Sequence, residues 1–215
     1  MRLFLSSYRF GADPAALLRV TGPPGPIAVI GNAADAWSAH ARRSAVVSEF
    51  GPLRDLGFDP VEVDLRDHIG APESLRARIS EFRSAWVRGG NTFVLRAQLA
   101  RSGGDTVLTD LLRSGSLAYA GYSAGACVVT STLRGIEFSD DPGEVLPTCG
   151  IAPQWDGLGL VDFAIVPHAG GSLLDDGGSS RAVDLLTRSH IEFRALTDDE
   201  AIVVDTSAGT GTSHC

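Results

Sequence analysis

The sequence predicts an α/β fold, a three-layer sandwich with a mostly parallel sheet and helices on both faces. Strand-like and helix-like segments alternate along the 215 residues, which is typical of parallel strands joined by crossover helices. Apolar residues make up 44% and charged residues 20%, as in an ordinary globular protein. This length allows one substantial core, so we expect a single domain over residues 1–205 and a Gly/Ser/Thr-rich tail over 206–215.

The strands are predicted from short apolar runs bounded by turn residues. They are expected at residues 2–7, 27–32, 59–65, 84–87, 117–122, 160–168 and 195–205. The strand that ends at His168 matters most for function, because open α/β sheets place their sites at the carboxyl ends of strands.

Helices are predicted where apolar residues recur at helical spacing between these strands. Pro72 near the start of one helix is favourable, and Gly103 or Gly104 can end another. Pro52 is expected to break a third helix into two pieces. Residues 134–158 are rich in Pro, Gly and Asp and predict a long loop. The expected helical segments are 35–57, 71–82, 91–103, 105–115 and 179–190.

Charge and cysteine usage exclude several classes of protein. The net charge of −8 argues against nucleic acid and membrane surfaces as partners. Cys127, Cys149 and Cys215 form no metal-binding pattern, and sparse cysteines suit a reducing compartment. No apolar run is long enough for a membrane span or a signal peptide. We therefore expect a cytoplasmic protein without metal or cofactor, as a monomer or homodimer.

The segment from Gly121 to Gly125, Gly-Tyr-Ser-Ala-Gly, carries the strongest chemical signal. It matches G-x-S-x-G after a predicted strand and before a predicted helix, where a strained turn can expose a nucleophile. Ser123 is then the nucleophile. The alternative is a turn of small residues needed only for close helix–sheet packing. Cys127 is a weaker candidate, because one turn into the helix it should be buried.

A serine nucleophile needs a base and an acid that orients the base. His168, at a predicted strand end, is the favoured base among the five histidines. The acid is expected either in the loop, at Asp141 or its neighbour Asp140, or directly before the last strand, at Asp198. The other histidines fall in helical patterns, a loop and the tail: His40, His68, His190 and His214.

Gly89 and Gly90 lie between a predicted strand and a predicted helix. The sequence there has neither G-x-G-x-x-G nor G-K-[ST], so a nucleotide site is weakly supported. Glycine amides at the same sheet edge as Ser123 fit an oxyanion hole better, together with the N–H of Ala124.

Three segments together resemble a known family. They are "WVRGGNTFVL", "AYAGYSAGACVV" and "GLGLVDFAIVPHAG", and their order and spacing are similar to those of dipeptidase E, the aspartyl dipeptidase family of serine peptidases. The resemblance extends from about Arg2 to Asp205. It implies a fold like that of class I glutamine amidotransferases and hydrolysis of dipeptides with an N-terminal aspartate, without a metal.

The resemblance also implies roles for individual residues. Ser123 corresponds to the nucleophile and His168 to its general base, with the amides of Gly90 and Ala124 in the oxyanion hole. The family's acid corresponds to Asp198, with Asp141 as the alternative.

Some features depart from the family pattern and keep other functions open. Arg88 stands where relatives often have glycine, and it either crowds the site or supplies a cation for an acidic substrate side chain. The interval from Ser123 to His168 is long for the family, and the chain ends in a Gly/Ser/Thr-rich stretch. An esterase-like α/β-hydrolase remains an alternative if Asp141 is the acid, because the chain order is then Ser-Asp-His. A non-catalytic amidotransferase-like binding module is a third possibility.

Overall fold

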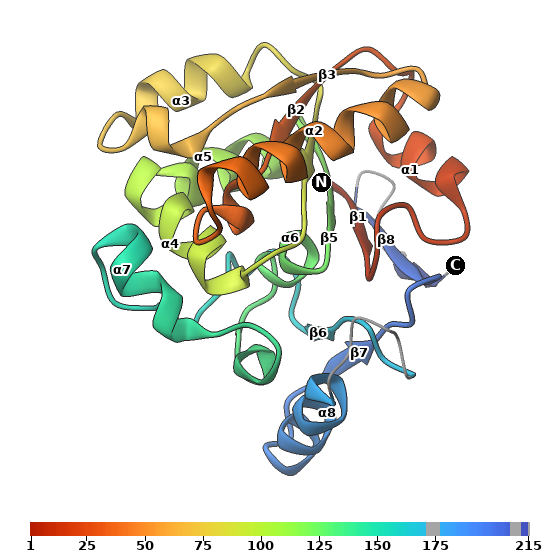
Figure 1. Cartoon of the computed structure of the whole chain (residues 1–215). Coiled ribbons are helices and arrows are strands. Elements are labelled where there is room, and N and C mark those ends of the chain that lie inside the picture. The colour runs from red at the N-terminus through yellow and green to blue at the C-terminus, as the bar shows by residue number, and fades with distance from the viewer. Residues whose placement is uncertain (171–176, 207–211, 215) are drawn as a thin grey trace.

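A computed structural model of the chain describes residues 1–170, 177–206 and 212–214. Its centre is a sheet of seven strands within these ranges, drawn in Figure 1. The strands follow the order β3 (Asp59–Glu62), β2 (Pro26–Ile30), β4 (Ser84–Val87), β5 (Ala118–Tyr122), β1 (Arg2–Ser6), β8 (Ala201–Asp205) and β9 (Thr212–His214). The mostly parallel sheet expected from the sequence is confirmed.

The direction of β8 determines which loops meet at the functional edge of the sheet. β1 to β5 run parallel, whereas β8 pairs with β1 in the antiparallel direction, with Leu5 opposite both Gly121 and Ile202. The segment that precedes β8 therefore reaches the edge at which β1, β4 and β5 end. Residues from four loops can meet at that edge.

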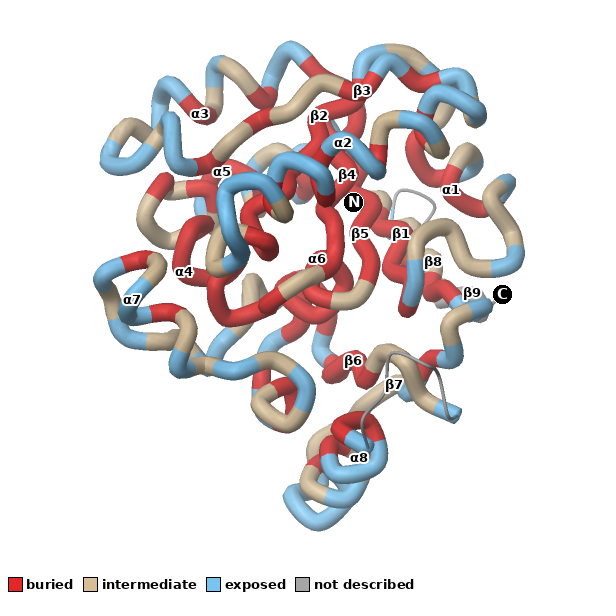
Figure 2. The backbone as a smooth tube through the Cα atoms, viewed as in Figure 1, coloured by how far each residue is buried: buried red, intermediate tan, exposed pale blue. Residues whose placement is uncertain are grey.

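Helices cover both faces of the sheet, as Figures 1 and 2 show. Strand side chains alternate between the faces: Phe4 and Trp86 pack with one helical layer, and Leu3 packs with the other. The first layer holds α1 (Pro14–Thr21) and α2 (Ala39–Asp55). The second holds α3 (Pro72–Ile79), α4 (Thr92–Ser102), α5 (Gly104–Arg113) and the short α6 (Ala124–Cys127).

A small second unit carries the segment before His168. β6 (Ala164–Val166) pairs in parallel with β7 (Phe193–Ala195), and α8 (Gly178–Arg188) packs on this pair, apart from the main sheet (Figure 1). The sequence predicted a longer strand that ended at His168. The strand ends earlier because Pro167 has no N–H to continue the ladder.

The predicted break at Pro52 is wrong. α2 runs from Ala39 to Asp55 with Pro52 inside it, and Ser38 caps its start by accepting a hydrogen bond from the Ala41 N–H. A proline clashes with the backbone N–H and the Cβ of the preceding residue, which disfavours helix there. Gly51 precedes this proline and has no Cβ, so one part of that clash is absent.

The remaining segments agree in part with the expectations. Residues 134–158 contain no strand, but they include the short helix α7 (Val145–Cys149) and two 3₁₀ turns, η3 (Ile136–Phe138) and η4 (Pro142–Glu144). Two further 3₁₀ turns are η1 (Asn32–Ala34) and η2 (Leu65–His68). Of the predicted tail, Thr212–His214 form β9 against β8, and residues 207–211 and 215 lie outside the described residues. None of the helices in the described ranges has the length and apolar content that a bilayer span requires.

The start of α6 packs directly on the sheet without a side chain between. The Tyr119 hydroxyl donates a hydrogen bond to the Gly125 carbonyl oxygen at 2.6 Å. A Cβ on Gly125 would collide with the Val87 carbonyl oxygen, and a Cβ on Gly121 would lie 2.6 Å from the Gly125 carbonyl oxygen. Glycine is therefore required at both positions for the helix to begin here.

We expect Gly125→Ala to lower the free energy of unfolding by about 2 kcal/mol, because the new methyl group must displace the backbone of β4. Urea unfolding followed by tryptophan fluorescence measures the loss. The matched control is Gly25→Ala, where a Cβ meets nothing within 4 Å. The control should change stability by less than about 0.5 kcal/mol. Equal losses in both variants would contradict the close packing described above.

Candidate active site

Ser123 occupies a strained turn between β5 and α6. Its φ is +50° and its ψ is −115°, a conformation that residues other than glycine rarely adopt. The Ser123 N–H donates to the Ser6 carbonyl oxygen at 3.0 Å, and the Ser123 carbonyl accepts from the N–H groups of Ala126 and Cys127. These bonds hold the turn, and the hydroxyl lines an open cavity of about 540 Å³.

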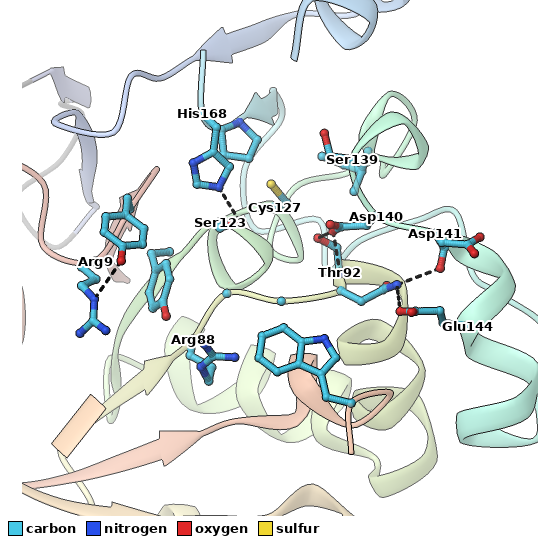
Figure 3. A pocket seen from close by; sticks show the side chains of 18 residues that line it. Arg9, Arg88, Thr92, Ser123, Cys127, Ser139, Asp140, Asp141, Glu144 and His168 are labelled. Carbon is cyan, nitrogen blue, oxygen red and sulfur yellow. Dashed lines mark hydrogen bonds between the residues drawn. The ribbon is translucent and has the colours of Figure 1, made fainter. Parts of the chain in front are cut away.

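His168 lies directly beside this hydroxyl. Its Nε2 is 3.1 Å from the Ser123 Oγ, and its Nδ1 is 2.6 Å from Oδ1 of Asp198. Figure 3 shows the imidazole above Ser123, and both residues line the cavity. The His168 side chain is only 14% exposed, so the contact with Ser123 is largely shielded from solvent. The backbone of His168 also has a positive φ, +60°.

The structure distinguishes the two acids considered for this site. Asp198 precedes β8 and contacts His168, because the antiparallel direction of β8 brings this segment to the edge where β1 and β5 end. The Asp141 carboxylate instead accepts a hydrogen bond from the Gly143 N–H at 2.7 Å and caps η4. Asp141 lines the cavity but does not meet His168 among the residues described.

Ser7 is a member of the site that the sequence analysis missed. Its hydroxyl donates to Oδ1 of Asp198 at 3.1 Å and accepts from the backbone N–H of His168 at 2.7 Å. One side chain thus fixes both the acid and the backbone that carries the imidazole. The feature of the sequence that could have identified Ser7 is its position directly after β1, at the sheet edge where functional sites form.

The glycine turn after β4 reaches the same edge. Gly90 has φ +145°, and a Cβ on it would lie 2.5 Å from the Ala33 carbonyl oxygen. A Cβ on Gly89 would lie 3.0 Å from the Ser123 Cβ. In the described part of the chain, the amides of Gly90 and Ala124 donate no hydrogen bond. Both N–H groups are available to an oxygen bound above Ser123.

Arg88 lies in the cavity wall and pairs with a buried carboxylate. Its Nε donates to Oε1 of Glu49 at 3.3 Å, and Glu49 also accepts from Trp86 Nε1 at 3.0 Å and from the Tyr122 hydroxyl at 2.8 Å. Burial and the Glu49 carboxylate raise the pKa of Tyr122. The Arg88 guanidinium lies over the ring of Trp37, 5.2 Å from its centroid. Its Nη1 is buried and has no hydrogen-bond partner within the described residues.

Asp140 is a second carboxylate in the cavity wall. It accepts hydrogen bonds from the N–H and the hydroxyl of Thr92, at 2.8 and 2.6 Å. Burial raises its pKa to about 6, against the opposing effect of these hydrogen bonds. Asp140, Asp141 and Glu144 lie together on one side of Ser123 in Figure 3.

Cys127 does not compete with Ser123 as a nucleophile. It is 1% exposed, and burial raises the pKa of its thiol well above the usual value. A buried thiol that stays protonated is a weak nucleophile. The other histidines lie outside the cavity: His40 in α2, His68 in η2 and His190 after α8, while the side chain of His214 is outside the described residues.

Comparison with known proteins identifies the family. Residues 36–210 match the sequence profile described as peptidase family S51. The chain belongs to peptidase family S51. The match covers the glycine turn, Ser123, His168 and Asp198, whereas Ser7 precedes the matched residues.

Curated relatives of this S51 chain are similar over about half of its length. An uncharacterized peptidase of Listeria innocua, Lin0382, is 35% identical over 120 residues, which are 54% of this chain and 52% of that protein. A protein named peptidase E from Streptomyces coelicolor is 36% identical over 118 residues, 55% of this chain and 42% of that protein. The chain therefore spans about half the length, or less, of these curated relatives.

Solved structures support the fold over the whole chain. A crystal structure of a protein provisionally described as peptidase E from Listeria monocytogenes EGD-e has a TM-score of 0.78 and 22% identity, and the match covers 100% of this chain and 97% of that one. A peptidase from an acI-B1 actinobacterium has a TM-score of 0.65 and 16% identity, over 94% of this chain and 82% of that one. At these identities, the likeness shows the fold.

Replacement of Asp140 should change the pH dependence of stability. A carboxyl with a raised pKa keeps its proton longer in the folded than in the unfolded protein, so the folded state loses stability as pH rises from about 4 to about 6. Asp140→Asn removes this loss because an amide does not titrate, and its oxygen can still accept a hydrogen bond from Thr92. Relative to wild type, the variant should gain stability across this range, by at most about 3 kcal/mol.

Urea unfolding at pH 4, 5, 6 and 7 measures this difference. Asp162→Asn, at an exposed aspartate, is the control and should follow the wild-type profile. Parallel profiles for wild type and Asp140→Asn would show that the Asp140 carboxyl titrates normally.

Proposed function

We propose that the protein is a serine peptidase that hydrolyses short peptides, with dipeptides that begin with aspartate as its substrate class. The observation that carries the proposal is the hydrogen-bonded chain from Ser123 through His168 to Asp198, on a turn that exposes the serine hydroxyl. Membership of peptidase family S51 supports the reaction type. The preference for aspartate rests on the resemblance to dipeptidase E.

In the proposed mechanism, the Ser123 Oγ attacks the scissile carbonyl carbon while His168 Nε2 takes the hydroxyl proton. Asp198 accepts a hydrogen bond from Nδ1–H, which fixes the tautomer and stabilises the imidazolium. The amides of Gly90 and Ala124 stabilise the oxyanion of the tetrahedral intermediate. His168 then protonates the leaving amine, and a water activated by the same imidazole hydrolyses the acyl-enzyme.

The charges of the cavity wall suit a short peptide with a free N-terminus. Asp140 and Glu144 make one side acidic, which favours an α-ammonium group. The volume of about 540 Å³ is within the range of small-molecule sites. The buried, unpaired Nη1 of Arg88 is our candidate for the side-chain carboxylate of an aspartyl substrate, although Glu49 already neutralises part of its charge.

An esterase-like function has less support than a peptidase function. It depended on Asp141 as the acid and on the chain order Ser-Asp-His. The contact of His168 with Asp198 supports the order Ser-His-Asp instead.

The two free cysteines in the described residues, Cys127 and Cys149, are both buried and suit the reducing cytoplasm that we propose as the location.

Hydrolysis of aspartyl-leucine by wild type and by Ser123→Ala tests the proposed function. We expect the variant to lose at least about 10³-fold in kcat, because the Ser123 hydroxyl is the group that contacts the imidazole Nε2 of His168. Release of free leucine provides the assay, and p-nitrophenyl acetate hydrolysis measured in parallel separates esterase from peptidase activity. Equal rates for the two proteins would rule out the serine mechanism.

A serine-directed fluorophosphonate provides a separate test of the binding-module alternative. An adduct on wild-type Ser123, absent from Ser123→Ala, is expected for a working nucleophile. Failure of the wild type both to form the adduct and to hydrolyse peptides would favour a binding module.

Two isosteric variants identify the acid. Asp198→Asn should lower kcat by about 10³- to 10⁴-fold, because an amide can no longer hold the imidazole in the required tautomer. Asp141→Asn is the matched control, since asparagine can also accept from the Gly143 N–H, and its kcat should change by less than about threefold. The opposite ranking would assign the acid to the loop and favour the α/β-hydrolase chain order.

A further inference from the structure

Arg9 lies in the wall of the Ser123 cavity, in the loop between β1 and α1. Figure 3 shows it on the opposite side of Ser123 from Asp140 and Glu144. The cavity therefore has a cation on one side of the nucleophile and carboxylates on the other. The sequence analysis did not consider Arg9, since it belongs to none of the motifs.

The backbone of Arg9 is held in a strained conformation. Its φ is +46°, and its carbonyl oxygen accepts a hydrogen bond from the Ser6 hydroxyl. The next residues are fixed to the segment that carries Asp198, because the Ala12 N–H donates to the Asp199 carbonyl oxygen at 2.8 Å. Backbone strain in a wall of the site, maintained by surrounding bonds, indicates that the position of this side chain matters.

The charge of Arg9 is not neutralised by an ion pair among the residues described. Its Nε donates a long hydrogen bond to the Tyr8 hydroxyl, at 3.4 Å, and its guanidinium lies 5.8 Å from the centroid of the Tyr8 ring. Neither Nη atom has a hydrogen-bond partner in the described part of the chain. The two terminal amino groups are thus free to bind a carboxylate in the bidentate manner of arginine.

Arg9 lies in the same cavity as His168 and close in the chain to a residue that positions it. Ser7, two residues earlier, contacts both His168 and Asp198. The leaving amine must face His168, since the imidazole gives it a proton. In a dipeptide the terminal carboxylate belongs to that same leaving residue, which spans at most about 3.6 Å. A cation that recognises this carboxylate must therefore lie in the wall of the same cavity, as Arg9 does.

We infer that Arg9 binds the free C-terminal carboxylate of the substrate and thereby favours dipeptides over longer or C-terminally blocked peptides. This inference rests on the proposed peptidase function and adds a specificity residue to it. A dipeptide zwitterion matches the cavity at both ends, because its ammonium group faces Asp140 and its carboxylate faces Arg9. A C-terminal amide keeps the scissile bond and the first residue but loses the charge that Arg9 recognises.

The test compares aspartyl-leucine with aspartyl-leucinamide as substrates of wild type, Arg9→Gln and Arg9→Lys. For wild type we expect kcat/KM to be at least about tenfold higher for the free acid, the usual effect of a charge-assisted hydrogen bond. Arg9→Gln should reduce this ratio to about one, mainly through KM for the free acid. Arg9→Lys should retain part of the wild-type ratio, since lysine keeps the positive charge but lacks the planar guanidinium that binds a carboxylate through two N–H groups. Arg113→Gln, at an exposed arginine in α5, should leave the ratio at the wild-type value.

Calorimetric binding of both peptides to Ser123→Ala, with and without Arg9→Gln, separates this inference from the proposed function. Tighter binding of the free acid that depends on Arg9 supports the inference even if wild type hydrolyses neither peptide, an outcome that would overturn only the peptidase proposal. If wild type hydrolyses both peptides and Arg9→Gln keeps the wild-type ratio, the inference is wrong and the proposed function stands. If Ser123→Ala binds the two peptides equally, Arg9 does not recognise the carboxylate.

Discussion

The close approach of the Ser123 turn to the strands beneath it is the constraint on which the rest of the site depends. The start of α6 contacts β4 and β5 through Gly121 and Gly125, where any side chain would meet backbone atoms. This approach forces Ser123 to a positive φ and exposes its hydroxyl and the Ala124 N–H at the sheet edge. Gly89 can lie against Ser123, and Gly90 against Ala33, only because neither has a side chain.

The partners of Ser123 come from segments that are distant in sequence, and the sheet topology brings them together. The antiparallel direction of β8 places Asp198 at the edge where the parallel strands end, and Ser7 at the end of β1 connects Asp198 to His168. The opposite side of the cavity is formed by the loop with Asp140 and by Arg88, which pairs with the buried Glu49. A parallel last strand in the same position would have carried Asp198 to the far edge of the sheet.

Much of the fold and of the site could be predicted from local patterns. The alternation of segments predicted the parallel sheet, and the small residues around Ser123 predicted the turn before α6. Interactions between residues distant in sequence could not be predicted from such patterns. The pairing of Arg88 with Glu49 joins the end of β4 to α2. The contact of Ser7 with His168 likewise has no indication in the residues around Ser7. The choice between Asp198 and Asp141 likewise required the direction of β8, which residue patterns do not encode. The continuation of α2 through Pro52 also differs from the local pattern, in which a proline ends a helix.

The small unit of β6, β7 and α8 has a consequence for how the site responds to heat. It carries His168, and among the described residues its own core has four buried members, Ala164, Val166, Ala182 and Leu186, whereas α6, which follows Ser123, packs in the much larger core of the main sheet. A unit with few buried apolar contacts opens at a lower free energy than the domain as a whole. The imidazole would then part from the serine hydroxyl while the sheet is still intact. We therefore expect heat to separate His168 from Ser123 before the main sheet unfolds.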